Sequence, residues 1–157
     1  MTLIINSLQL LLAGALGWLI GYERRTKHKP AGARTFSLIC LGCTLMTLVG
    51  TKGFADATGA ARVVATIITG IGFIGAGVIW KGGGSVKGIT TAVLIWVCAG
   101  VGMAIGLGLY ALAITAFLVS FAFVITKEAD EIHELDAMQS DEKGRTRGRK
   151  KAKGARA

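Results

Sequence analysis

The sequence predicts an all-α membrane protein with five transmembrane helices, its N-terminus outside and its C-terminus in the cytoplasm. Its 157 residues are 52% hydrophobic, and the apolar residues form blocks rather than an alternating pattern. Each of the five blocks is about 17–20 residues long, enough to cross a hydrocarbon core of about 30 Å as a helix. The charges are segregated too, because Asp56 is the single acidic residue between Arg25 and Thr126.

The five predicted helices are joined by links of different composition. The first run ends in a basic hinge that holds the only proline, Pro30, and it lacks the basic start of a cleavable signal peptide. A short polar link follows the second run and a glycine-rich link follows the third, while Gly106-Leu107-Gly108 makes a tight hairpin before the fifth. The predicted transmembrane domain is therefore 1–126, with helices at about 3–22, 35–51, 61–80, 89–105 and 109–126.

The basic residues predict the side on which each link lies. With five crossings, the first link, the third link and the tail share a side that holds sixteen of the eighteen Lys and Arg residues. Lys52 and Arg62 lie on the other side. Because loops rich in Lys and Arg stay in the cytoplasm, the N-terminus is predicted to be outside.

The C-terminal tail, 127–157, divides into two parts. Seven acids lie between Lys127 and Glu142, where apolar residues at helical spacing predict an extension of the fifth helix. The remainder is basic and is predicted to be disordered, and it suits anionic lipid head groups. A solvated tail that only fixes topology is the alternative. Nucleic acid is not expected as a partner, because the basic run has no aromatic residue to stack on bases.

The chain is organised around the glycine-rich run 62–80. Its letters from Gly70 to Gly75 fit the dinucleotide-binding pattern G-x-G-x-x-G, but that pattern needs a preceding strand, and here it lies inside a membrane-length apolar run. In lipid, small residues spaced four apart let helix backbones approach closely, and stripes left over suit a homodimer. Local unwinding, as in transporters with broken helices, is the alternative. The predicted helix-packing residues are Gly17, Gly21, Gly32, Gly70, Gly72, Gly75, Gly77, Gly88, Gly102 and Gly106.

No catalytic, metal or cofactor site is expected. Cys40 and Cys43 form a C-x-x-C inside an apolar run, without the further ligands that a zinc site needs, and are predicted to pack as apolar side chains. No charged residue lies near the midplane to line a cation path, and no nucleophile has a base and an orienting acid, so an enzyme is not predicted. The polar candidates inside the spans are hydroxyls that commonly bond back to their own helix: Thr44, Thr47, Thr66, Thr69 and Thr115.

The charged residues gather at the predicted helix boundaries. Glu23 closes the first helix and Arg34 opens the second, so an ion pair between them is geometrically possible. Lys87, Thr90 and Thr91 open the fourth helix on the same side. These residues are either anchors whose charged ends reach the interface or a polar cytoplasmic cluster that binds a partner or a ligand.

Three motifs follow one another in the chain. They are GYERR at 21–25 with KPAGART at 29–35, RVVATIITGIGFIGAGVI at 62–79, and KGITTA at 87–92 continuing to Trp96. In this order they resemble the G-x-E-R…K-x-A-G-x-R-T, R-V-A-A-Q-I-V-x-G-I-G-F-L-G-A-G-V-I and V-R-G-L-T-T-A-A-x-x-W segments of the MgtC/SapB family. The likeness covers about residues 13–110. The chain departs from the family at Thr66 and Phe36, where Gln and His are often found.

The resemblance implies a multi-pass protein of the bacterial cytoplasmic (inner) membrane, linked to magnesium homeostasis. Some members of the family are also linked to virulence and to restraint of the F-type ATP synthase, so the resemblance implies that enzyme as a partner. Longer members carry a soluble C-terminal domain, which the short tail here is expected to lack. The family motifs mark a polar cluster of eight residues: Glu23, Arg24, Lys29, Arg34, Thr35, Arg62, Thr90 and Thr91.

Three hypotheses about function follow from the sequence. The first is a non-enzymatic membrane regulator that acts by contact with another membrane complex. The second is a small transporter of ions or solutes whose path runs along the glycine-rich third and fourth helices. The third is a lipid- or membrane-stress protein that acts through its basic tail.

Overall fold

The structure, a computed structural model, describes residues 1–27, 29–53, 57–82 and 85–125. Its contacts divide the chain into two compact units, Met1–Ser120 and Phe121–Ala157. The predicted tail, 127–157, with its acidic helix and its basic segment, lies outside the described residues.

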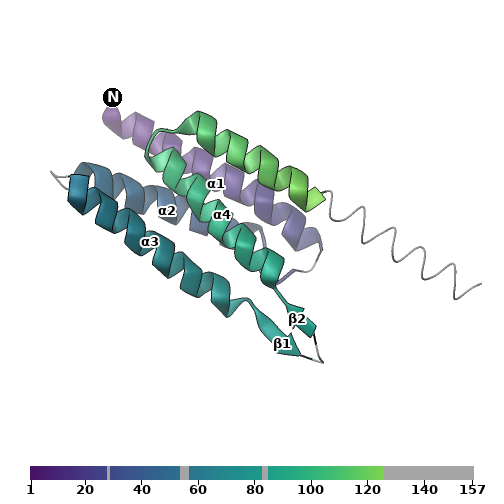
Figure 1. The fold of residues 1–157 in the computed structure, drawn as a ribbon. Helices are drawn as coiled ribbons and strands as arrows, with labels where there is room; N and C mark the ends of the chain where they lie inside the picture. Colours follow the sequence, from purple (N-terminus) through teal and green to yellow (C-terminus); the bar gives the residue numbers. More distant parts are fainter. Residues whose placement is uncertain (28, 54–56, 83–84, 126–157) are drawn as a thin grey trace, which may run out of the picture. The chain divides into compact units, whose positions relative to one another are not determined.

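The first unit is built from long helices that lie side by side (Figure 1). They are α1 (Thr2–Thr26), α2 (Ala33–Gly53), α3 (Ala57–Gly77) and α4 (Ile89–Gly106). Between α3 and α4, a short strand β1 (Trp80–Gly82) pairs antiparallel with β2 (Ser85–Lys87). A further apolar helix follows at Tyr110–Ile125. Apart from this small β-hairpin, the described chain is helical, as predicted.

The outer surface of the helices is apolar. Leu3 is 79% exposed, Leu11 69% and Phe73 83%, whereas a soluble monomer rarely exposes large continuous apolar patches. Three helices, α1, α2 and α4, are long and apolar enough to cross a membrane, and Ala61–Gly77 and Tyr110–Ile125 are shorter apolar helices. The fold therefore suits a lipid environment.

The third helix ends earlier than the sequence predicted. It stops at Gly77, where Val78 N–H and Ile79 N–H bond to the carbonyls of Gly75 and Ala76 in tighter, three-residue turns. Trp80 then pairs with Lys87 across the hairpin instead of ending the helix. Bulky β-forming residues beside a glycine-rich turn favour this hairpin over further helix.

The helix α2 lies at the centre of the unit and contacts α1, α3 and α4. Against α1 the spacing is that of two backbones in contact: a Cβ at Gly17 would lie 2.5 Å from the Phe36 carbonyl oxygen, and one at Gly21 would lie 2.6 Å from Ala33 Cα. Since residue numbers rise on one helix as they fall on the other, α1 and α2 are antiparallel. Ser37 Oγ also donates to the Gly14 carbonyl (3.1 Å).

The helix α4 also packs against α2 and runs parallel to it. A Cβ at Gly102 would collide with the Cys40 carbonyl oxygen, and one at Gly106 would lie 2.7 Å from Thr47 Cβ. Thr44 Oγ1 donates to the Gly102 carbonyl across the two helices (2.8 Å). Close approach at small residues with a cross-helix hydrogen bond is how helices associate in lipid.

The helix α3 is less closely packed. It meets α2 where a Cβ at Gly50 would lie 2.9 Å from Val63 Cβ, and it meets α4 where a Cβ at Gly75 would lie 3.5 Å from the Ala92 carbonyl oxygen. At Gly70, Gly72 and Gly77 a Cβ would meet no heavy atom of the described chain within 4 Å. These three glycines, predicted to pack helices, do not pack against another helix in the part of the chain that the structure describes.

The two remaining glycines of the predicted set lie in links. Gly88 has φ +89°, a conformation that side chains rarely adopt, and a Cβ there would collide with the Val78 carbonyl oxygen. This contact closes the base of the β-hairpin. Gly32 lies beside α1, where a Cβ would be 3.4 Å from Arg25 Cβ.

We expect Gly17→Ala to destabilise the protein by about 1–3 kcal/mol, because the added methyl must push the α2 backbone away. The control is Gly42→Ala, where the methyl would meet nothing within 4 Å. This control should be neutral or slightly stabilising. Reversible unfolding in mixed micelles measures both, and equal stabilities of the two variants would contradict the close α1–α2 contact.

Candidate functional site

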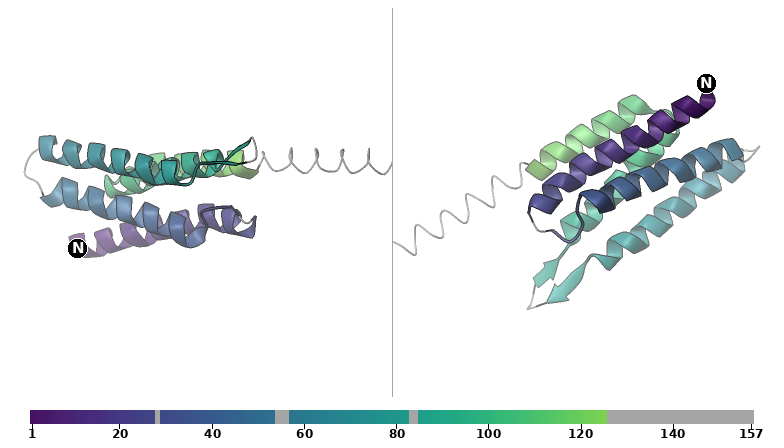
Figure 2. Two further views of the ribbon diagram at one scale, coloured as in Figure 1. Left: turned by 90° about the horizontal axis from the view of Figure 1, so that it is seen from below. Right: turned by 180° about the vertical axis from the view of Figure 1, so that it is seen from behind.

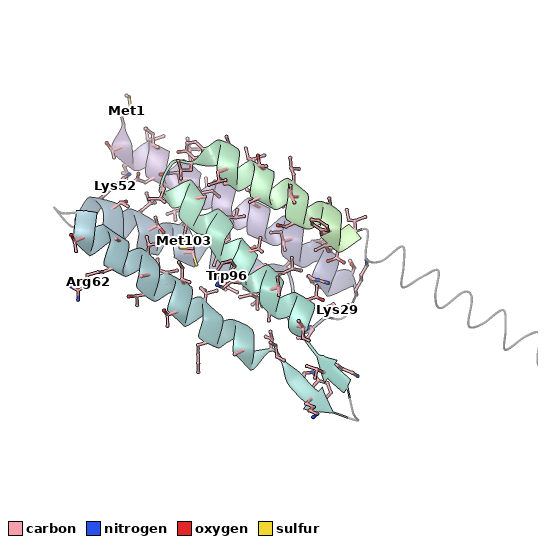
Figure 3. The ribbon with its side chains drawn as sticks, in the orientation of Figure 1. Met1, Lys29, Lys52, Arg62, Trp96 and Met103 are labelled. Carbon is pink, nitrogen blue, oxygen red and sulfur yellow. The ribbon has the colours of Figure 1, made fainter. Side chains whose placement is uncertain are left out.

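The charged side chains of the bundle gather at one end. Figure 3 labels Lys29 at this end, and Lys52 and Arg62 at the opposite end. Of the nine Lys and Arg residues among the described ones, seven lie around the α1–α2 link and the β-hairpin: Arg24, Arg25, Lys27, Lys29, Arg34, Lys81 and Lys87. Both further views show the β-hairpin at the same end of the helices as the α1–α2 link (Figure 2).

The centre of the charged end is Glu23. Its carboxylate accepts from Arg24 Nε, with 3.2 Å between Nε and Oε2, and its Oε1 lies 3.2 Å from Lys27 Nζ. The side chains of Arg24 and Glu23 are only 7% and 11% exposed. Arg24 is buried because it continues the α1 stripe of Ala13, Gly17 and Gly21 that faces α2. A shielded pair of this kind is less screened by water than a surface ion pair.

The ion pair between Glu23 and Arg34 that the sequence allows is not formed. Glu23 pairs within its own helix, and Arg34 is exposed at the start of α2. The close contact of Gly21 with Ala33 sets the spacing of the link there. Lys29 N–H donates to the Arg24 carbonyl (3.1 Å), which closes the end of α1.

The other members of the predicted polar cluster are divided by the structure. Lys29, in the α1–α2 link, and Thr35, in the first turn of α2, are exposed, whereas Thr91, at the start of α4, is 2% exposed. Thr90 is half-buried. Arg62 is not part of the cluster, because it lies at the opposite end, where it lines an open groove of about 410 Å³ with Met46, Val63, Thr66 and Ile67.

The hydroxyls of the spans bond to backbone carbonyls, as expected. Each of the five donates to the carbonyl four positions earlier in its own helix, and Thr44, which donates to Cys40, also donates to the Gly102 carbonyl. The other bonds are Thr47 to Cys43, Thr66 to Arg62, Thr69 to Ala65, and Thr115 to Ala111. Cys40, Cys43 and Cys98 are buried, and no group of three His, Cys, Asp or Glu residues that could hold a metal occurs in the described ranges.

One buried polar residue was missed by the sequence analysis. Gln9 is 5% exposed on α1, and its Nε2 donates to the Ile105 carbonyl at the end of α4 (2.7 Å). Its Oε1 is buried and has no hydrogen-bond partner among the described residues. The signal was present in the sequence, since Gln9 is an amide inside the first apolar run. An amide there is expensive in lipid unless a partner exists.

Comparison with known proteins gives a consistent result. The model of the MgtC family matches residues 10–133 of this chain. Protein MgtC of Salmonella choleraesuis (strain SC-B67) is 38% identical over 138 residues, which is 87% of this chain and 59% of that protein. Protein MgtC of Brucella abortus (strain 2308) is 42% identical over 113 residues, 69% of this chain and 47% of that protein. The chain thus spans about half of these relatives' lengths. No solved structure matches it.

We expect Arg24→Gln to destabilise the α1–α2 hairpin by about 1.5–3 kcal/mol, because it removes a shielded hydrogen bond between charged groups. Arg25→Gln is the matched control, since Arg25 is exposed on the next position of the same helix. That variant should change stability by less than about 0.5 kcal/mol. Unfolding in mixed micelles measures both, and equal losses would show that the Glu23–Arg24 pair contributes nothing particular.

We expect Gln9→Leu to leave stability within about 1 kcal/mol of the parent. It loses one hydrogen bond, worth about 0.5–1.5 kcal/mol, but also removes an unpartnered buried oxygen that costs about 1–3 kcal/mol. The Ile105 carbonyl keeps its bond from Gly108 N–H (2.9 Å). Gln9→Glu should destabilise strongly, because a carboxylate would then face that carbonyl. A large loss in Gln9→Leu would contradict an unpartnered Oε1.

Proposed function

Since the chain belongs to the MgtC family of membrane proteins, we propose that it is a non-enzymatic regulator of the bacterial cytoplasmic membrane, linked to magnesium limitation. It acts by direct contact between α3 and another membrane protein. The observation that carries this proposal is the open space at Gly70 and Gly77, where no heavy atom of the described chain lies within 4 Å of an added Cβ.

The proposed topology has five crossings with an outside N-terminus. Seven of the nine described Lys and Arg residues lie at one end of the bundle, which supports a cytoplasmic position for that end. Three of the helices have the length and composition of a membrane span. The two shorter apolar helices, in α3 and at Tyr110–Ile125, complete the five crossings in this proposal.

The proposed docking surface is the glycine face of α3, defined by Thr66, Thr69, Gly70, Phe73 and Gly77. These residues recur three or four positions apart, so they share one side of the helix. All five are exposed, and Phe73 is 83% exposed between Gly70 and Gly77. A large ring between two positions without side chains offers a knob and two holes to another helix.

The exposed side of α1 provides a comparison. Leu3, Leu8 and Leu11 are 79%, 59% and 69% exposed, and such bulky side chains fill the space between lipid tails. Glycine on an exposed face offers lipid no side chain to contact, but it lets a second backbone come close. The contrast supports a protein contact on α3 and lipid contact on α1.

The partner on this surface is a second copy of the chain or another membrane complex. The family resemblance makes the F-type ATP synthase the candidate complex. The proposed link of this chain to magnesium limitation likewise rests on the family resemblance. Neither a catalytic step nor a cofactor is needed for a contact of this kind, which supports a role other than that of an enzyme.

The alternative function is a transporter with a path along α3 and α4. The packing favours the regulator, because two of the three glycines of α4 are packed against α2. Gly102 and Gly106 lie against Cys40 and Thr47 with no room for a Cβ. A path along this side of α4 would require α2 and α4 to separate.

We expect a photo-crosslinking residue at Phe73 to capture a discrete protein partner in native membranes, because this position lies at the centre of the glycine face. The same residue at Leu11 should capture lipid only. Adding Gly70→Leu should abolish capture at Phe73, whereas Gly42→Leu should not. An added Cβ at either glycine would meet no heavy atom of another described segment within 4 Å, so folding should survive both changes.

Two results would contradict the regulator. Identical adducts from Phe73 and Leu11 would show that the glycine face contacts only lipid. Magnesium or other ion flux through the protein in liposomes, lost in Gly72→Leu, would instead favour the transporter.

A further inference from the structure

The β-hairpin between α3 and α4 carries a second set of exposed groups that the proposed regulator does not use. Trp80 is 54% exposed and Val86 51% exposed, and Lys81 and Lys87 are exposed as well. The register pairs Trp80 with Lys87 and Lys81 with Val86. Because directly opposed residues lie on one face of a hairpin, each face presents one apolar side chain and one ammonium group.

The hairpin is attached firmly to the ends of two apolar helices. Val78 and Ile79 lead directly from α3 into Trp80, and Ile89, 53% exposed, begins α4 directly after Gly88. The contact of Gly88 with the Val78 carbonyl closes the base of the hairpin. The hairpin therefore begins where the apolar helices end, which is the depth at which hydrocarbon gives way to head groups in a bilayer.

The residues of the hairpin have the chemistry of that depth. Trp is enriched at the membrane interface, and Lys buries its apolar stem while its ammonium reaches the head groups. Lys87 Nζ lies 5.4 Å from the centre of the Trp80 ring, so the two side chains form one amphipathic unit.

Among the described residues, the two ammonium groups have no partner of opposite charge. Glu23 is the only Asp or Glu in the part of the chain that the structure describes, and its carboxylate is paired with Arg24 and Lys27. Neither Lys81 nor Lys87 forms an ion pair within the described ranges. Five further Lys and Arg residues lie at the same end, around the α1–α2 link. This end therefore offers charge complementarity to an anion.

We propose that Trp80, Lys81 and Lys87 form a binding site for the head group of an anionic phospholipid. On the face that carries Trp80, the Lys87 ammonium binds the head group and the Trp80 ring lies beside the start of the acyl chains, while Lys81, on the other face, adds a second positive charge at the same depth. A basic residue near an anionic membrane surface strengthens binding about fivefold. The two lysines together therefore select anionic over zwitterionic lipid.

The test uses the full chain with Trp18→Phe and Trp96→Phe, which leaves Trp80 as the sole tryptophan. The protein is placed in phosphatidylcholine nanodiscs that contain brominated phosphatidylglycerol or, in equal amount, brominated phosphatidylcholine. Bromine quenches tryptophan only at close range, so the ratio of the two quenching constants reports the lipid beside Trp80. We expect quenching by the brominated phosphatidylglycerol to be at least about threefold stronger.

Matched variants separate the site from the net charge. Lys81→Gln with Lys87→Gln should bring the quenching ratio close to one, and either change alone should give an intermediate ratio. Lys52→Gln with Arg62→Gln removes the same charge from the opposite end and should leave the ratio unchanged. Both pairs are exposed, so circular dichroism should confirm that the helices are retained.

Several outcomes would overturn the proposal. Equal quenching by the two lipids, or a preference that survives loss of both lysines, would show that the hairpin does not select anionic lipid. Absence of quenching by either lipid would place Trp80 in water. A preference that appears only after the acids of 128–142 are neutralised would show that the chain's own acidic segment occupies the lysines. A preference abolished by millimolar inorganic phosphate would identify a soluble anion as the ligand.

Discussion

Backbone contact at glycine is the constraint on which the rest of the structure depends. In water, helices are driven together by burial of apolar side chains, but in lipid the tails are as apolar as leucine and this driving force is absent. The helix α2 is instead approached at main-chain distance by Gly17 and Gly21 from α1, and by Gly102 and Gly106 from α4. A methyl group at any of these positions would have to displace another helix. These short backbone contacts hold the bundle together. The hydrogen bond from Thr44 to the Gly102 carbonyl adds a directional interaction between α2 and α4.

The same constraint explains what the sequence could predict and what it could not. Long apolar runs require helices in lipid, because every backbone polar group has to be satisfied within the segment, so the helical fold followed from composition alone. Small residues four apart predicted close contacts, but spacing does not say which neighbour meets which glycine. Gly102 and Gly70 look alike in the sequence, and only the structure separates a glycine packed against Cys40 from one that faces open space.

The candidate site shows a similar division. The sequence placed Glu23, Arg24 and Lys29 near one helix boundary, because charges cannot lie deeper in lipid. It could not choose Glu23's partners among Arg24, Lys27 and Arg34, and the structure pairs Glu23 with Arg24 and Lys27 of its own helix rather than with Arg34. Short strands such as Trp80–Gly82 have no periodicity to detect, and their hairpin was therefore seen only in the structure.

Phe36 connects these contacts in a way that matters for motion. Its side chain is fully buried, its carbonyl oxygen faces Gly17 of α1, and the same oxygen accepts the Cys98 thiol of α4 at 3.4 Å. A side-chain amide or hydroxyl could shift by changing rotamer, but a main-chain carbonyl moves only with its helix. Sliding of α1 along α2 at this level must therefore shift the carbonyl that α4 also touches. The three helices therefore meet at one main-chain oxygen, and a displacement of α2 at this level changes its contacts with both α1 and α4.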